Sequence, residues 1–146
     1  MPPMARMHEG RLHHVGLIVR SIEESMPGYL RSLGGTWDSQ IFHDPIQRVK
    51  VAFLNPGLGP QVQIELVEPV GENSPVRRFL ESSNGGMHHL CYEVKNLEES
   101  LKEMRAGGAR LVRPPKPAVA FEGRRIAWVL TAENLLIELL EETARC

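Results

Sequence analysis

The chain has 146 residues, of which 42% are hydrophobic and 24% charged, and its formal net charge is −1. These values are ordinary for a globular domain, and they do not support a nucleic-acid or anionic-membrane partner, which would favour a strong positive excess. Because no apolar run approaches the roughly 20 residues of a membrane span, and no secretion signal is present, we expect a cytoplasmic protein. Its cysteines, Cys91 and Cys146, form no spacing motif and are expected to be free thiols.

The first half of the chain is predicted to form a strand, a helix and three more strands. Residues 11–20 are rich in β-forming side chains and end at Ser21. Ser21 and Glu24 have the spacing of a capping box, which predicts a helix from there to about Leu33, where Gly34 and the glycine after it end the helix. Three predicted strands follow, at residues 36–43, 48–54 and 61–68.

The second half repeats this succession after a connecting segment at residues 70–86. Within that segment Ser74, followed by a proline, predicts the start of a short linker helix. A strand begins at about residue 87, and the pair Asn96 and Glu99 then predicts a second capped helix. Three predicted strands follow, at residues 109–114, 124–130 and 135–141.

The two halves also share sequence motifs. "LHHVGLIVRSIEES" at 12–25 and "MHHLCYEVKNLEES" at 87–100 align without gaps on two histidines, a valine, two glutamates and a serine. "IELVE" at 64–68 recurs as "IELLE" at 137–141. A unit of roughly seventy residues is too long for a solenoid repeat and indicates a duplicated module.

The duplication predicts an α+β fold in a single domain over residues 1–146. Two βαβββ modules, at about 11–69 and 87–142, are each expected to form a mainly antiparallel sheet. The segment 70–86 links them.

Four polar residues hold matching positions in the two modules. A pseudo-twofold axis that brings His14 near Glu65 also brings His89 near Glu138. Two imidazoles and two carboxylates suit a borderline divalent cation. A lone histidine in a strand is more often structural, but a carboxylate in an apolar run such as that around Glu138 costs desolvation free energy unless it is paired. We therefore take these four as candidate metal ligands.

The other histidines are not assigned a role. Side chains alternate along a strand, so His13 and His88 are expected on the sheet face opposite to His14 and His89. His8 falls in the N-terminal tail and His43 in a loop.

These motifs resemble the vicinal oxygen chelate superfamily, and within it the methylmalonyl-CoA epimerases. The resemblance covers about residues 11–142 and rests on the two repeated motifs, on "VKVAFLN" with "VQIELVEP", and most specifically on "NSPVRRFLESSNGGMHHLCYEV". It implies paired βαβββ modules that form a half-open barrel around one divalent ion, such as Co, Zn, Ni, Mn or Fe. The residues matching the family's ligands are His14, Glu65, His89 and Glu138.

The resemblance also implies an activity. Such enzymes move a proton α to a carbonyl, which implies a metal-dependent epimerase or isomerase with Glu138 and Glu65 as catalytic groups. The substrate would be a small carbonyl compound, in this family an acyl-CoA, and the assembly a homodimer. The same ligand set occurs in bacterial glyoxalase I, so a lyase acting on a small oxo-compound or thiol adduct is the alternative. A non-catalytic small-molecule-binding module is a further reading. An extradiol dioxygenase is disfavoured because it uses one carboxylate with two histidines.

Two departures from the family pattern concern the substrate site. Some epimerases carry a second acid/base glutamate on the strand matching residues 47–54, where this chain has no carboxylate. The segment "HPKS…GG", which helps frame the acyl-CoA site in the family, is replaced here by "LTAENLL" at 130–136. Whether the substrate is a CoA thioester is therefore left open by the motifs.

Overall fold

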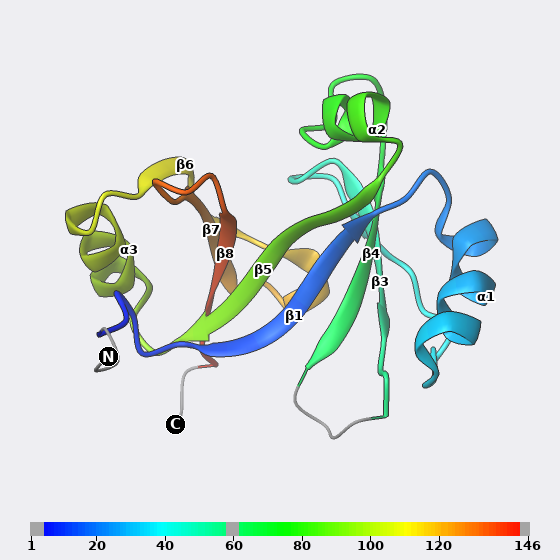
Figure 1. Ribbon diagram of the computed structural model, residues 1–146, viewed down its shortest axis with the longest axis horizontal. Coiled ribbons are helices and arrows are strands. Elements are labelled where there is room, and N and C mark those ends of the chain that lie inside the picture. Colours follow the sequence, from blue (N-terminus) through cyan, green and yellow to red (C-terminus); the bar gives the residue numbers. More distant parts are fainter. Residues whose placement is uncertain (1–4, 58–61, 144–146) are drawn as a thin grey trace.

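A computed structural model describes residues 5–57 and 62–143 (Figure 1), and Cys146 lies outside them. It contains two matching sets of elements with a short helix, α2 (Arg77–Ser83), between them. The first set is β1 (Arg11–Ile18), α1 (Ile22–Leu33), β2 (Phe42–Asp44), β3 (Val49–Leu54) and β4 (Gln63–Pro69). The second set is β5 (Gly86–Val94), α3 (Leu97–Ala106), β6 (Arg110–Pro117), the 3-10 helix η1 (Val119–Phe121), β7 (Arg125–Leu130) and β8 (Leu136–Glu141).

All eight strands join in one curved sheet with the order β2-β3-β4-β1-β5-β8-β7-β6. From the middle of the sheet outward, each module has its first strand, then its last, then its third and then its second. In the middle β1 pairs antiparallel with β5, and each is parallel to the last strand of its own module. The remaining pairs are antiparallel. The predicted α+β fold of two βαβββ modules in a half-open barrel is confirmed.

Helices α1 and α3 lie at opposite ends of the molecule, each against the sheet of its own module (Figure 1). The predicted caps are present, because the side chain of Ser21 accepts a hydrogen bond from the Glu24 amide and that of Asn96 from the Glu99 amide. The amide of Ile22, at the start of α1, also donates to the Glu68 carboxylate at 2.8 Å. This contact from β4 fixes the start of α1 against its own sheet and satisfies an amide that the helix leaves unpaired.

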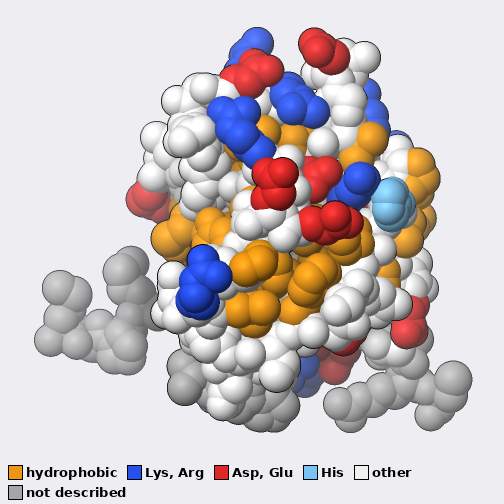
Figure 2. Space-filling model, turned by 90° about the vertical axis from the view of Figure 1, so that its right-hand side faces the viewer, with side chains coloured by type: hydrophobic (Ala, Val, Ile, Leu, Met, Phe, Trp, Pro, Cys, Tyr) orange, Lys and Arg blue, Asp and Glu red, His pale blue; other side chains and the backbone are white. Residues whose placement is uncertain are grey.

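The outer surface at the α1 end is partly apolar. Ile22 and Met26 are fully buried against the sheet, whereas Tyr29 and Leu30 remain half-buried. On this face hydrophobic side chains gather in the centre, below a group of acidic and basic ones (Figure 2). None of the described helices is long and apolar enough to cross a membrane.

The strand predicted at residues 36–43 is mostly a loop, and only Phe42–Asp44 is extended. Asp38 accepts a hydrogen bond from the Gln40 amide, and Ser39 has a φ of 67°. This side-chain turn competes with strand geometry, as aspartate commonly does.

The linker helix also differs from the expectation. It begins at Arg77, with Val76 rather than Ser74 at the N-cap position. The hydroxyl of Ser74 is buried and makes no hydrogen bond, while its carbonyl accepts from the Arg77 amide in a turn.

Candidate metal centre

The pairing of β1 with both neighbours places three residues in a row across the sheet. Gly16 lies opposite Glu65 on β4 and opposite His89 on β5. Directly opposed residues share one face of the sheet, so the two side chains converge over the glycine. A Cβ atom on Gly16 would lie 2.0 Å from Cε1 of His89, so only glycine leaves room for the imidazole there.

A second row repeats this arrangement from the other module. Cys91 lies opposite His14 on β1 and opposite Glu138 on β8. Cys91 holds the repeat position of Gly16, and its thiol is free, fully buried and within 4.8 Å of a ring nitrogen of His14. The duplicated fold therefore delivers one histidine and one glutamate in each row.

The four donor atoms meet in one compact cluster. Nε2 of His14 and Nε2 of His89 are 3.3 Å apart. Oε1 of Glu65 lies 3.4 Å and 3.3 Å from these two nitrogens, and Oε1 of Glu138 lies 3.1 Å and 3.6 Å from them. Four tetrahedral bonds of about 2.0–2.2 Å to one cation would hold their donors about 3.3–3.6 Å apart. The spacing of the cluster fits a single small ion.

Burial and hydrogen bonding also fit an ion. All four residues are at most 5% exposed. Oε1 of Glu138 makes no hydrogen bond, although it lies 3.1 Å from Nε2 of His14. A buried carboxylate oxygen without a hydrogen bond is costly unless a further partner satisfies it. A borderline divalent cation accepts this nitrogen and oxygen donor set.

Protons and a cation would compete for the cluster. Burial alone would lower the pKa of His14, but the charge of Glu65 and the contact with Cys91 raise it well above its usual value. Burial alone would raise the pKa of Glu65, but His14 and His89 lower it. Without a metal the cluster therefore holds a proton on His14 beside an ionised Glu65, and a metal would displace that proton.

Comparison with known proteins places this chain in a family. The family described as Glyoxalase/Bleomycin resistance protein/Dioxygenase superfamily matches residues 13–128. The chain belongs to this superfamily. It is 32% identical over 121 residues to the ethylmalonyl-CoA/methylmalonyl-CoA epimerase of Cereibacter sphaeroides, covering 82% of this chain and 87% of that protein.

The chain is also similar to solved structures. A hypothetical protein of Bacillus halodurans is 31% identical with a TM-score of 0.81, over 94% of this chain and 98% of the other. The methylmalonyl-CoA epimerase of Mycobacterium tuberculosis is 28% identical with a TM-score of 0.76, over 98% and 94%. The resemblance inferred from the motifs is confirmed.

The first histidine of each pair does not point away from the cluster, and that expectation is wrong. Between β1 and β5 the register shifts at His13, which is an extra residue on β1, and again at His88, an extra residue on β5. Such β-bulges change the direction in which a side chain points. As a result Nδ1 of His13 lies 2.8 Å from Nδ1 of His14, and Nδ1 of His88 lies 2.9 Å from Nδ1 of His89.

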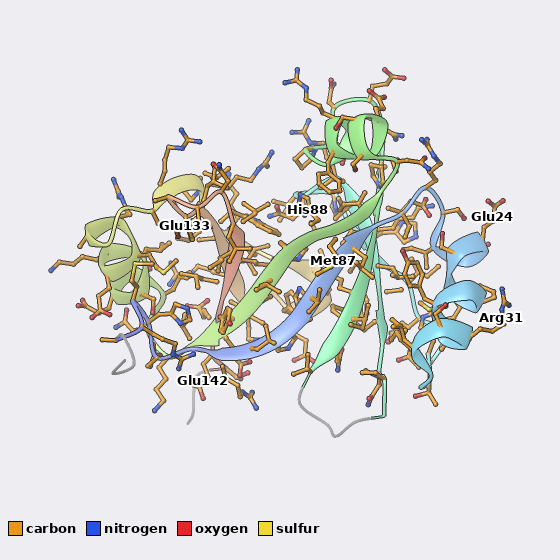
Figure 3. All side chains as sticks on the ribbon, in the orientation of Figure 1. Glu24, Arg31, Met87, His88, Glu133 and Glu142 are labelled. Atoms are coloured by element: carbon orange, nitrogen blue, oxygen red, sulfur yellow. The ribbon has the colours of Figure 1, made fainter. Side chains whose placement is uncertain are left out.

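These two histidines are neutral near pH 7. Burial, assisted by the neighbouring His14, lowers the pKa of His13 to about 4. Burial, assisted by the neighbouring His89, lowers the pKa of His88 to about 4. His88 lines a cavity next to the cluster, whereas its neighbour Met87 is 72% exposed (Figure 3).

The cluster opens into a mainly apolar cavity of about 220 Å³ on the concave side of the sheet. Side chains of both modules line it, among them Val49, Val51, Val67, Val76, Ile126 and Trp128. The side chain of Lys50 does not line the cavity and pairs with Glu68 at 3.6 Å. As the sequence predicts, β3 supplies no carboxylate to the cavity.

One wall of the cavity is formed by residues 113–121, at the end of β6 and in η1. Phe121 in η1 stacks on His14 with ring centres 5.8 Å apart. The buried Asp44 of β2 accepts a hydrogen bond from the Val119 amide at 3.2 Å, which ties η1 of the second module to the first. The contact joins residues 75 positions apart, so no local sequence pattern predicts it.

Proposed function

We propose that the protein is a metal-dependent epimerase that moves the proton α to the carbonyl of a malonyl-type acyl-CoA. The observation that carries the proposal is the buried cluster of two imidazoles and two carboxylates at the inner end of an apolar cavity. The names of the Cereibacter sphaeroides and Mycobacterium tuberculosis relatives support the reaction and the acyl-CoA substrate.

The four side chains of the cluster would hold the divalent ion, for which Co, Zn, Ni, Mn and Fe are candidates. When bound, such an ion acts as a Lewis acid on the negative charge that develops at the carbonyl oxygen, which is worth several kcal/mol of transition-state stabilisation. The residues of the cluster are His14, Glu65, His89 and Glu138.

The proton transfer itself falls to the two carboxylates, Glu138 and Glu65. We propose that a carboxylate oxygen of Glu138 takes the α-proton, and that Glu65 serves the opposite face of the α-carbon. Both side chains line the cavity, so both are within reach of a bound substrate. The part of β3 that lines the cavity consists of valines. The acidic residues that line it are therefore Glu65, Glu138 and Asp44, and the Asp44 carboxylate already accepts backbone hydrogen bonds.

A lyase acting on a thiol adduct is the second candidate. Such a lyase would use the same donor set. It is favoured by the lack of a carboxylate on β3, because the cavity then has no counterpart of the additional acid/base group of some epimerases.

The test is exchange of the substrate α-proton in heavy water, followed by NMR. The metal-loaded protein should exchange the α-proton of methylmalonyl-CoA or ethylmalonyl-CoA, and the metal-depleted His89→Ala variant should not. Turnover of a hemithioacetal without exchange on either acyl-CoA would replace the epimerase by the lyase. Inactivity on all three substrates at full metal occupancy would reject both.

We also propose that the two modules act as one domain in a cytoplasmic homodimer with C2 symmetry. Each module supplies one histidine and one glutamate to the cluster, so neither holds the site alone. The half-buried apolar side chains at the α1 end support an assembly, because oligomers cover such surfaces. Size-exclusion chromatography with light scattering should give twice the chain mass of 16.4 kDa, and a monomer at micromolar concentration would contradict the dimer.

A further inference from the structure

The paired histidines next to the cluster form the same contact twice. In each module the β1–β5 bulge places the first imidazole against the second, and the two Nδ1 atoms lie 2.8 Å apart in one module and 2.9 Å in the other. The rings stand nearly perpendicular, at 77° for His13 on His14 and 90° for His88 on His89. Two separate occurrences of one local geometry, both beside candidate ligands, indicate a common role.

The contact fixes which nitrogen carries the proton. Nε2 of His14 and Nε2 of His89 point into the cluster, and a nitrogen that binds a metal must offer a lone pair. In a neutral imidazole the proton then resides on Nδ1, which becomes a hydrogen-bond donor. The only group placed to accept from Nδ1 of His89, in the part of the chain that the structure describes, is Nδ1 of His88.

Packing holds the accepting rings in place. His13 meets Phe121 edge to face at 5.4 Å between ring centres, and His88 meets Phe79 at 4.9 Å. The acceptors are therefore fixed in orientation by aromatic neighbours outside the cluster.

We infer that His13 and His88 are positioning residues, each of which accepts a hydrogen bond from Nδ1–H of the following histidine and so aims its Nε2 at the metal. This inference rests on the proposed metal centre and adds a pair of residues that the ligand set does not include. Partners of this kind set ligand orientation and basicity, and their loss typically lowers metal affinity about 10- to 100-fold.

The test compares two replacements at each position. Phenylalanine keeps an aromatic ring but offers no acceptor. Asparagine loses the ring but carries its Oδ1 the same number of bonds from the backbone as Nδ1, so it can still accept. Affinity for Zn²⁺ and Co²⁺ is measured by chelator competition, and the ligand field by visible absorption of the Co²⁺-loaded protein. His43→Phe, at an exposed position on β2, is the matched control.

We expect His13→Phe and His88→Phe each to weaken metal binding about 10- to 100-fold and to alter the Co²⁺ spectrum. His13→Asn, His88→Asn and the control should stay within about threefold of the wild type. Phenylalanine variants with wild-type affinity, or asparagine variants that fall as far, would overturn the inference. If the folded wild type binds no ion, or if His89→Ala binds it fully, the metal centre itself is wrong. Should a phenylalanine variant not fold, leucine replaces it, because leucine also lacks an acceptor.

Discussion

Glu65 and Glu138 have the same chemistry, but their surroundings in the cluster differ. Both histidines lower the pKa of Glu65, although burial opposes them, and they thereby hold Glu65 as an anion. Oε1 of Glu138 is buried without a hydrogen bond. A carboxylate that is held less firmly can leave a metal and accept a proton more readily.

Replacing each glutamate by glutamine should therefore give unequal losses. Glu138→Gln should reduce α-proton exchange by about 10²- to 10⁴-fold, the usual contribution of a general base, because an amide cannot accept that proton. Glu65→Gln should be milder. The rates must be compared at equal metal occupancy, measured by elemental analysis. The reverse order would make Glu65 the main base, as expected for a glyoxalase-like enzyme.

The neutral His13 and His88 predict how the stability of the metal-free protein depends on pH. Their pKa values of about 4 lie below the usual histidine value of 6.5. Between pH 6.5 and 4 the unfolded chain binds more protons than the folded one, so the free energy of unfolding should fall as the pH falls through this window. Urea unfolding at pH 7 and pH 5 would measure the loss. The double variant with asparagine at both positions should lose less, and an equal loss would contradict the pKa assignment.

At the scale of elements, the sequence predicts regular structure well and its interruptions poorly. Periodicity and caps place the starts of α1 and α3 correctly because these depend on side chains three positions apart. Alternation along each strand, combined with the duplication, predicts that His14 and His89 converge, and both lie in the cluster. It fails for His13 and His88 because each bulge depends on how two strands 75 positions apart are paired, which neither strand encodes alone.

Gly16, where β1 pairs with β4 and β5 beneath the cluster, provides a test of how His89 is positioned. A Cβ atom at this position would lie 2.0 Å from His89, so Gly16→Ala should displace the imidazole and reduce bound metal by at least tenfold. The backbone of Gly16 is not among those with positive φ, so the fold itself should tolerate alanine. Gly28→Ala, where the nearest atom would be 3.9 Å away, is the control. Elemental analysis and circular dichroism measure the two effects, and a fully metallated Gly16→Ala would refute this account of the site.

At the scale of the whole molecule, the duplication is what makes the four-residue cluster predictable. A symmetric pair of modules needs only one correct contact to imply the second, and the repeated histidine and glutamate motifs supply both. The cavity wall formed by η1 was not predictable in this way, because the hydrogen bond from the Val119 amide to Asp44 joins the modules through segments that share no motif.

A metal held by both modules should stabilise the entire molecule rather than one half. A ligand present at 100 times its dissociation constant adds about 2.7 kcal/mol to the free energy of unfolding. For a chain of this length that corresponds to a rise in Tm of about 5–10 °C. Chelation should therefore lower Tm by this amount in calorimetry, and re-addition of Zn²⁺ should restore it. Unfolding should remain a single transition, because β1 and β5 unite the modules in one sheet. An unchanged Tm, or a separate transition for one module, would show that the ion does not link the two halves.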